Sequence, residues 1–266
     1  MGSAMRQGRL WGAAAQDWAQ LQERMALPLW EALLDAAAVG PGTHVLDAGC
    51  GAGGASVRAA QRGAYVNGLD AAEALLAIAR QRLPDGDFRT GDLEALPYPS
   101  GTFDAILVAD VLPYVADPVA VLRELRRVCN WLGRLVVATW GLPEECNQWA
   151  IEAAVRTLVP VPPDVERFAL SGPGALEGLL AQTGLVLIGS GTVACLSEYP
   201  DGETLWQAQA AAGPLQALLR VVGAAPLKAA VLRAVAPYRS STGSVRLQNH
   251  VRYVVATPHD DDRPTR

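Results

Sequence analysis

The chain is poor in the residues that build metal centres. Its 266 residues include three histidines and one lysine, Lys228. Three histidines cannot form a His-rich metal site. The formal net charge is −5, whereas a broad nucleic-acid surface needs an excess of basic residues. We therefore expect no metal and no nucleic acid as partners.

Cysteine pairs and long apolar runs are also missing. Cys50, Cys129, Cys146 and Cys195 lie far apart and form no Cys-x-x-Cys motif, which argues against a metal site or a disulfide framework and fits a reducing compartment. No apolar run reaches the roughly 18 residues that span a bilayer, and no signal peptide is visible. These absences predict a cytoplasmic protein without a membrane segment.

What the sequence does contain is enough apolar material for one large α/β domain. Half of its residues are hydrophobic and 18% are charged. Short apolar stretches alternate with helical patterns, which predicts a mostly parallel sheet covered on both faces. Seven strands are expected, at residues 45–46, 65–69, 88–90, 103–108, 135–139, 185–195 and 245–257.

The glycine-rich stretch LDAGCGAGG, residues 46–54, follows the first expected strand and opens a helix. Such a loop lets a ligand approach the backbone and the positive end of the helix. Gly49, Gly51 and Gly54 satisfy the dinucleotide fingerprint G-x-G-x-x-G, a weak signal when it stands alone. Asp70, about 20 residues further on, can bind ribose hydroxyls. Both a dinucleotide and S-adenosylmethionine carry a ribose, so these residues leave the cofactor open.

Two acidic residues favour S-adenosylmethionine. Asp47 lies just before the glycines, where its charge would repel a pyrophosphate but would suit the ammonium group of a methionine moiety. Asp92 follows the third expected strand, where a carboxylate and a backbone N–H could hold an adenine edge.

Four segments in this order resemble the class I S-adenosylmethionine-dependent methyltransferases, specifically the small-molecule group that includes the ubiquinone and menaquinone methyltransferases. They are VLDAGCGAGG, GLDAAEALLAIAR, GDLEALPYPSGTFDAILVADVLPYV and LRELRRV, and the resemblance covers roughly residues 40–140. It implies a Rossmann-like, doubly wound sheet and S-adenosylmethionine as the cofactor. It also implies a set of cofactor-binding residues: Asp47, Gly49, Cys50, Gly51, Gly53, Asp70, Ala71, Asp92, Leu93, Ala109 and Asp110.

The sequence departs from this family in two places. The turn expected before the fifth strand reads CNWLG, residues 129–133, with an exposed-looking Trp131–Leu132 pair that we cannot explain from the sequence. Pro113–Tyr114 stands where many relatives carry a histidine pair, so histidine-based catalysis from that position is excluded. We assign no catalytic residue.

The remaining segments are assigned from their length and apolar content. Residues 6–39 are expected to form helices, interrupted at Pro28, that close over the cofactor, with Trp18 over its methionine end. The opening MGSAM resembles a cloning remnant and is left out of the fold. The core is expected to span 40–199, a helical cap over the acceptor 200–243, the last strand 244–257 and a tail 258–266.

The sequence thus predicts methyl transfer to an oxygen, nitrogen or carbon atom of a small, apolar or aromatic acceptor, by a monomer or a homodimer. Tyr114, Trp140 and His250 are the expected acceptor-site residues. A cofactor-binding protein that does not methylate, such as a cyclase or a regulatory subunit, is the alternative. An NAD(P)-dependent oxidoreductase is less favoured, because Lys228 has no tyrosine four residues before it.

Overall fold

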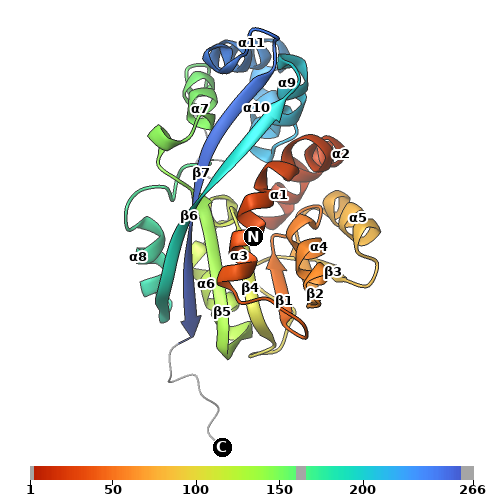
Figure 1. Ribbon diagram of the computed structural model, residues 1–266, viewed down its shortest axis with the longest axis vertical. Coiled ribbons are helices and arrows are strands. Elements are labelled where there is room, and N and C mark those ends of the chain that lie inside the picture. Colours follow the sequence, from red (N-terminus) through yellow and green to blue (C-terminus); the bar gives the residue numbers. More distant parts are fainter. Residues whose placement is uncertain (1–2, 160–165, 259–266) are drawn as a thin grey trace, which may run out of the picture.

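A twisted seven-stranded sheet forms the centre of the protein (Figure 1). The computed structural model describes residues 3–159 and 166–258. The strand order is β3-β2-β1-β4-β5-β7-β6; strands β1 to β5 pair in parallel, and β7 runs antiparallel between β5 and β6. The predicted seven-stranded, mostly parallel sheet is confirmed. The strands are β1 His44–Ala48, β2 Tyr65–Asp70, β3 Asp87–Thr90, β4 Phe103–Ala109, β5 Cys129–Trp140, β6 Leu185–Tyr199 and β7 Val245–Pro258.

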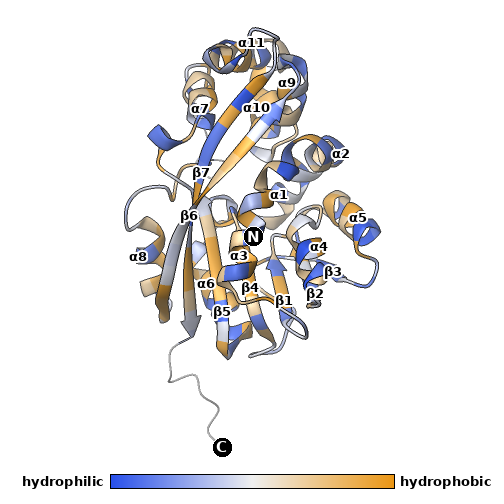
Figure 2. Cartoon of the chain, viewed as in Figure 1, coloured by the Kyte–Doolittle hydropathy of each residue, from blue (hydrophilic) through white to orange (hydrophobic). Residues whose placement is uncertain are grey.

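Alternating side chains of the central strands pack into two apolar layers, one on each face of the sheet. In β4, Ile106 and Val108 pack in one buried cluster, and Ala105 and Leu107 pack in another. Since successive side chains of a strand point to opposite faces, the continuous apolar run Ala105–Ala109 of β4 indicates burial on both sides. Figure 2 shows the hydrophobic colour along the central strands.

Helices from both halves of the chain cover these two faces. Residues of α6 (Pro118–Val128) and α8 (Ala175–Ala181) belong to the first cluster, and residues of α3 (Leu27–Ala36) and α4 (Gly54–Gln61) to the second. Helix α5 (Glu73–Arg82) packs against β2 and β3. This arrangement leaves the carboxyl ends of the parallel strands free to carry a site.

The N-terminal segment is a chain of short helices. It comprises α1 Ala4–Trp11, the 3-10 turn η1 Gly12–Ala14, α2 Ala15–Asp17, the π-helical turn η2 Trp18–Gln22 and the 3-10 turn η3 Glu23–Ala26, followed by α3. Two expectations were wrong here. Pro28 stands in the first turn of α3, where a missing N–H costs no hydrogen bond, so it begins a helix and does not interrupt one. The residues Ala4 and Met5 belong to α1 and therefore to the fold.

The Trp131–Leu132 departure lies in an irregular start of β5. Cys129 pairs with Phe103, but the next pair is Arg134 with Ala105, so the register shifts between them. The turn expected here is therefore part of a longer, bulged strand. The side chain of Leu132 is 70% exposed, and nothing in the structure explains why an apolar residue stands there.

Residues 200–243 are helical, as the sequence indicated. They form α9 Gly202–Ala210, α10 Gly213–Val222, α11 Ala224–Ala234 and the turn η7 Ala236–Tyr238. Together with α7 (Gln148–Arg156), the end of β6 and the start of β7 they enclose a separate apolar core. These helices lie at the top of Figure 1. Helix α10 contacts α1, and α9 contacts η2. The cap therefore packs against the N-terminal helices.

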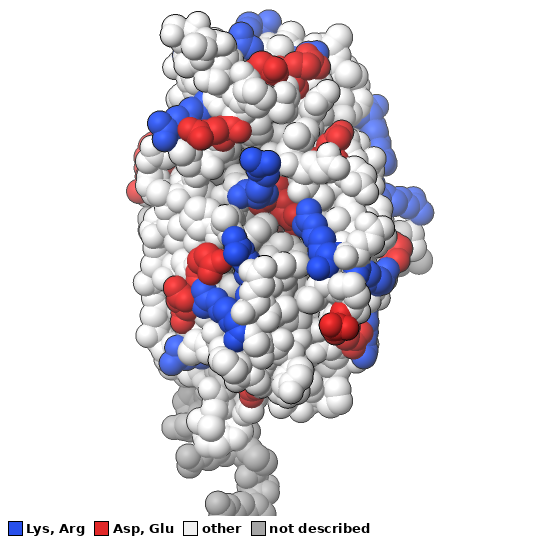
Figure 3. Space-filling view, turned by 45° about the vertical axis from the view of Figure 1, so that its right-hand side comes forward, with Lys and Arg blue, Asp and Glu red and all other residues white. Residues whose placement is uncertain are grey.

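Basic and acidic side chains lie next to one another on the face of the protein shown in Figure 3. Within residues 3–159 and 166–258, no helix has both the length and the apolar character needed to cross a membrane. Pro258, the first residue of the expected tail, ends β7; the rest of that tail, 259–266, lies outside the described residues.

Gly213 tests how closely the cap is fitted to the N-terminal helices. A Cβ added at Gly213, the first residue of α10, would lie 2.6 Å from ring atoms of Trp11. We expect Gly213→Ala to lower the free energy of unfolding by about 1–3 kcal/mol, because an overpacked ring must move. Urea denaturation measures it. Gly178→Ala is the control, since nothing lies within 4 Å of a Cβ there; equal effects of the two substitutions would contradict the close contact.

Candidate active site

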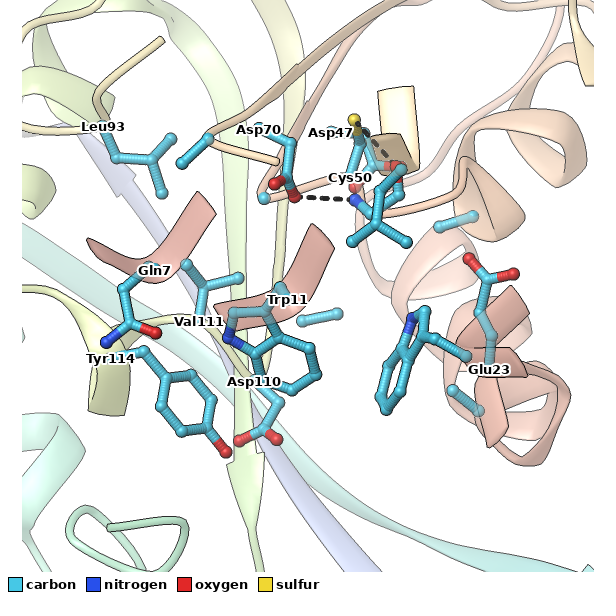
Figure 4. A pocket seen from close by; sticks show the side chains of 18 of the residues that line it. Gln7, Trp11, Glu23, Asp47, Cys50, Asp70, Leu93, Asp110, Val111 and Tyr114 are labelled. Carbon is cyan, nitrogen blue, oxygen red and sulfur yellow. Dashed lines mark hydrogen bonds between the residues drawn. The ribbon is translucent and has the colours of Figure 1, made fainter. Parts of the chain in front are cut away.

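A cavity lies at the carboxyl ends of the central strands, beneath the N-terminal helices (Figure 4). Most of the residues that the sequence nominated line it together. They are Trp18, Asp47, Gly49, Cys50, Gly51, Asp70, Ala71, Asp92, Leu93, Ala109, Asp110, Tyr114 and Trp140. Gly53 and His250 do not.

The glycine loop is shaped by left-handed backbone and close packing. Gly49, Gly51 and Gly53 have φ angles of +79°, +54° and +80°, which only glycine adopts easily. A Cβ on Gly49 would lie 2.5 Å from Val111 Cγ2, and one on Gly53 would lie 2.9 Å from Ala79 Cβ. Gly53 is thus needed for the packing of the loop on α5, and not for a wall of the cavity.

The loop's backbone N–H groups are largely occupied by the protein. Those of Gly49 and Cys50 donate to the Leu69 carbonyl, at 2.7 and 3.2 Å, and that of Gly51 donates to Asp70 Oδ2 at 2.9 Å. A phosphate bound at such a loop needs these donors. The geometry therefore offers little to the pyrophosphate of a dinucleotide.

Asp70 ends β2 and holds the loop against the start of the next helix. Its Oδ1 accepts a hydrogen bond from Ala72 N at 2.8 Å, while Oδ2 accepts the bond from Gly51. Burial raises the pKa of this carboxyl, and the backbone donors oppose that rise. Asp70 both shapes the loop and presents a carboxylate to the cavity.

Asp47 is buried at the end of β1, where its side chain is 2% exposed. Its Oδ2 accepts a hydrogen bond from Ser56 Oγ at 2.7 Å. Burial raises the pKa of Asp47 to about 6, the Ser56 bond lowers it, and the negative charges of Asp70 and Glu23 raise it further. This end of the cavity therefore has a surplus of negative charge when all three carboxyls are ionised.

Glu23 and Arg82 join the N-terminal helices to the loop, and sequence reasoning missed both. Glu23 Oε1 accepts from Gly54 N at 3.3 Å, and Oε2 accepts from Arg82 Nη1 at 2.5 Å. Arg82 also donates to the carbonyls of Ala52 and Ala19, at 2.9 and 3.1 Å. The only nearby hint is that Glu23 adjoins the apolar stripe of Trp11, Trp18, Leu21 and Met25.

Aromatic rings close the cavity from the side of the N-terminal helices. Trp11 lies edge-on to Trp18 and to Tyr114, with ring centroids 4.8 and 5.4 Å apart. Trp18 reaches the glycine loop, because a Cβ on Gly51 would lie 3.9 Å from its Nε1. Trp11, which the sequence analysis did not assign to the site, also lines the cavity.

Asp110 lies at the opposite end from Asp47 and Asp70 (Figure 4). It follows β4 with a φ of +57°, a conformation unusual for a residue with a side chain. Its Oδ2 accepts a hydrogen bond from Trp140 Nε1 at 2.6 Å. Oδ1 is buried and has no hydrogen-bond partner among the described residues. Burial raises the pKa of Asp110 to about 7, while Arg167 and the Trp140 bond oppose the rise.

Arg167 supplies the positive charge near Asp110, and nothing in the sequence singled it out. Its side chain is 2% exposed, lines the cavity and lies over the Trp140 ring, 5.1 Å from the centroid. Its Nε donates to Glu152 Oε1 at 3.0 Å. Since Glu152 is also buried, the two form an ion pair behind the Asp110 carboxyl.

Asp92 and Leu93 lie at the rim of the cavity. Asp92 Oδ1 accepts a hydrogen bond from Glu94 N at 3.0 Å, so Asp92 also caps its own turn, next to the buried Leu93.

His250, an expected acceptor residue, lies outside the cavity. Its Nδ1 is 3.0 Å from the Glu145 carbonyl oxygen, beside the turn η5 (Pro143–Glu145). None of the cap residues 200–243 lines the cavity; the N-terminal helices occupy the position expected for the cap.

Comparisons with known proteins place the glycine loop in a recognised domain. Residues 46–137 match the family "Methyltransferase domain". The chain is 38% identical to demethylmenaquinone methyltransferase of Renibacterium salmoninarum, over 43% of this chain and 48% of that protein. It is 37% identical to malonyl-[acyl-carrier protein] O-methyltransferase of Serratia marcescens, over 41% of this chain and 43% of that protein. The chain thus spans about half the length of the curated relatives it matches.

A solved structure shares the fold over most of the chain. The [4+2]-cyclase SpnF superposes with a TM-score of 0.55 at 20% identity, covering 86% of this chain and 80% of that one. At this identity the likeness concerns the fold alone.

Asp47 should make the empty protein less stable at neutral pH. A buried carboxyl whose pKa rises from 3.8 to about 6 favours folding most at low pH, and this contribution is lost as the pH rises through 6. Asn keeps an acceptor for Ser56 but carries no charge. We expect Asp47→Asn to be more stable than the parent by about 1–3 kcal/mol at pH 8, with the gap closing below pH 4.

Urea denaturation at pH 4, 6 and 8 measures this difference. Asp85→Asn, at an exposed position, is the control and should change little. If the stability difference between Asp47→Asn and the parent is no larger at pH 8 than at pH 4, the charge of Asp47 does not destabilise the folded protein.

Proposed function

We propose that this protein transfers a methyl group from S-adenosylmethionine to a small acceptor. Residues 46–137 match the methyltransferase domain family, which supports the proposal. The observation that carries the proposal is the buried acidic end of the cavity. Asp47, Asp70 and Glu23 gather there, and among the described residues only the Arg82–Glu23 ion pair brings a cation to them. A sulfonium and an ammonium group supply the missing positive charge, whereas a dinucleotide brings more negative charge.

The lining suggests which residue contacts each part of the cofactor. Asp70, whose two oxygens retain free lone pairs beside the bonds from Gly51 and Ala72, accepts hydrogen bonds from the ribose hydroxyls. Asp47 attracts the methionine end. Asp92 and Leu93, at the rim beyond Asp70, border the adenine, and Trp18 covers the donor from above.

The protein contributes to the reaction by positioning the acceptor and by excluding water from the cavity. The methyl group of a sulfonium is already activated, so the acceptor atom must be held in line at about 3–3.5 Å while water is excluded. Trp11, Trp18 and Tyr114 form the apolar wall that excludes water. The aromatic lining by Tyr114 and Trp140 suits an apolar or aromatic acceptor.

Ligand selectivity is the first test. S-adenosylhomocysteine should raise the melting temperature of the protein, whereas NADH should leave it unchanged, because only the former lacks a pyrophosphate. The shift should shrink below pH 6, as Asp47 takes up a proton and loses the charge that attracts the ligand's ammonium group. Thermal-shift titration measures both effects. Stabilisation by NADH without any by S-adenosylhomocysteine would exclude the proposed function.

Methyl transfer itself is tested with labelled S-adenosylmethionine and a panel of phenols, amines, thiols and carboxylic acids. Labelled product from at least one acceptor supports the proposal. A protein that binds S-adenosylhomocysteine but labels none would instead favour a cofactor-binding protein that does not methylate.

Asp70→Ala should weaken S-adenosylhomocysteine binding by about 2–4 kcal/mol, on the order of 30- to 1,000-fold, since hydrogen bonds to a charged group contribute about 1.5–3 kcal/mol each. Calorimetric titration gives the affinity. The substitution also removes two bonds to backbone N–H groups. Asp117→Ala is the matched control, because Asp117 likewise accepts from two backbone N–H groups, Val119 and Ala120, but lies outside the cavity. Equal affinity losses in both variants would remove Asp70 from the binding site.

A further inference from the structure

The Asp110 end of the cavity contains polar atoms that the cofactor assignment does not use. Three buried atoms have no hydrogen-bond partner among the described residues: Asp110 Oδ1, the Tyr114 hydroxyl and Arg167 Nη2. All three side chains line the same cavity. A buried polar group without a partner costs free energy, so a cluster of three in one cavity indicates the position of a ligand's own polar group.

The Asp110 carboxyl is oriented with one oxygen free. Trp140 Nε1 fixes Oδ2 at 2.6 Å. Trp140 is itself held, since Ser171 Oγ donates to its carbonyl at 3.0 Å and Arg167 lies over its ring. The left-handed backbone of Asp110 places the carboxyl beside the Tyr114 hydroxyl (Figure 4), which is close enough to lower the Asp110 pKa without the geometry of a full hydrogen bond. The free Oδ1 is therefore available to a ligand donor in this space.

The family resemblance assigns Asp110 to the cofactor, whereas this orientation leaves its free oxygen to another ligand. Asp47, Asp70 and Glu23 form the acidic group at the other end, and in Figure 4 the Trp11 ring lies between Asp110 and the pair Asp47 and Asp70. Tyr114, Trp140 and Arg167 are the lining residues that interact with Asp110. A flat acceptor fits this wall better than the polar end of an amino acid.

We propose that Asp110 is the proton acceptor for an acidic hydroxyl, a phenol or an enol, and that the enzyme methylates this hydroxyl on oxygen. The inference rests on the proposed function. The acceptor's O–H proton passes to Asp110 Oδ1, the hydroxyl oxygen forms a bond to the methyl carbon, and the carbon–sulfur bond breaks with its electron pair going to sulfur. The proton later leaves Asp110 for solvent.

The charges around Asp110 suit this step. Arg167 is paired with Glu152, so their joint charge is close to zero and Asp110 carries the titrating charge of this end. Tyr114 is the other ionisable group that faces it, and burial beside Asp110 raises the Tyr114 pKa, so Tyr114 stays neutral. With a pKa of about 7, Asp110 can accept a proton and release it near neutral pH.

Asp110→Asn is the sharpest test. Asn has the same shape, can accept the Trp140 bond and tolerates the left-handed backbone better than most residues, but it cannot accept the proton. We expect the rate of O-methylation of phenol to fall roughly 100- to 10,000-fold, with affinity for S-adenosylhomocysteine within about two-fold of the parent. With donor in excess, the parent rate should rise with pH through a midpoint below about 7, because the sulfonium charge lowers the Asp110 pKa, and the variant should lose this limb.

Acceptor acidity gives a second readout that a structural role would not produce. 4-Nitrophenol is already ionised at pH 8 and needs no base, so the variant should methylate it at a rate much closer to the parent's than it does phenol. Trp140→Phe removes the N–H that fixes Oδ2 and should lower the rate on phenol by a smaller factor, with the pH limb retained.

The outcomes separate this inference from the proposed function. Failure of the parent to bind S-adenosylhomocysteine defeats both. If the parent binds S-adenosylhomocysteine but neither methylates nor binds any phenol or enol, only the inference is defeated. The inference is also defeated if Asp110→Asn keeps the parent's rate and pH profile. A 30-fold or larger loss of S-adenosylhomocysteine affinity in this variant would defeat it as well, because Asp110 would then bind the cofactor.

Discussion

The burial of three carboxylates around one glycine loop is the constraint on which the site depends. Asp47, Asp70 and Glu23 have their pKa values raised mainly by desolvation, so each is held against the cost of its own charge. Hydrogen bonds from Ser56, from backbone N–H groups and from Arg82 offset part of this cost. The part of the cost that is not offset makes this end of the cavity favour a positively charged ligand. Under the proposed function, charge would favour a sulfonium donor over a dinucleotide, although both could fit a glycine-rich turn.

The same carboxylates explain how the N-terminal helices are held over the cavity. Glu23 belongs to η3 yet bonds to Gly54 at the start of α4, and Arg82 bonds to Glu23, Ala19 and Ala52. The segment is thus anchored through the loop that it covers. On its outer side α10 meets Trp11 so closely that Gly213 has no room for a Cβ. The cap therefore packs behind the covering helices; its apolar residues form their own core, and none of them lines the cavity.

The sequence predicted the sheet and most of the residues that line the acidic end of the cavity, because these rest on local patterns. Apolar runs end at Asp47 and Asp70, and parallel strands bring their carboxyl ends together whatever the details of packing. Glu23, Arg82 and Arg167 escaped notice because their roles depend on partners far away in the sequence; Arg82 and Glu23 are 59 residues apart. His250 was assigned to the acceptor site because a strand pattern does not reveal the extra turn, η5, that takes up its ring. The unusual backbone of Asp110 likewise has no local sequence signal.

The two ends of the cavity are linked by electrostatics if the donor binds as proposed. A positive charge placed between the acidic group and Asp110 favours the ionised form of Asp110 and lowers its pKa from about 7. Binding of the sulfonium would thereby prepare the base in the same event that brings in the methyl group. Transfer removes the positive charge, since the product is a neutral thioether, and the pKa of Asp110 rises again just when Asp110 holds the acceptor's proton. The charge that is consumed in the reaction would therefore also set the protonation state of the residue that drives it, so a free enzyme and a donor complex should titrate differently at this one carboxyl.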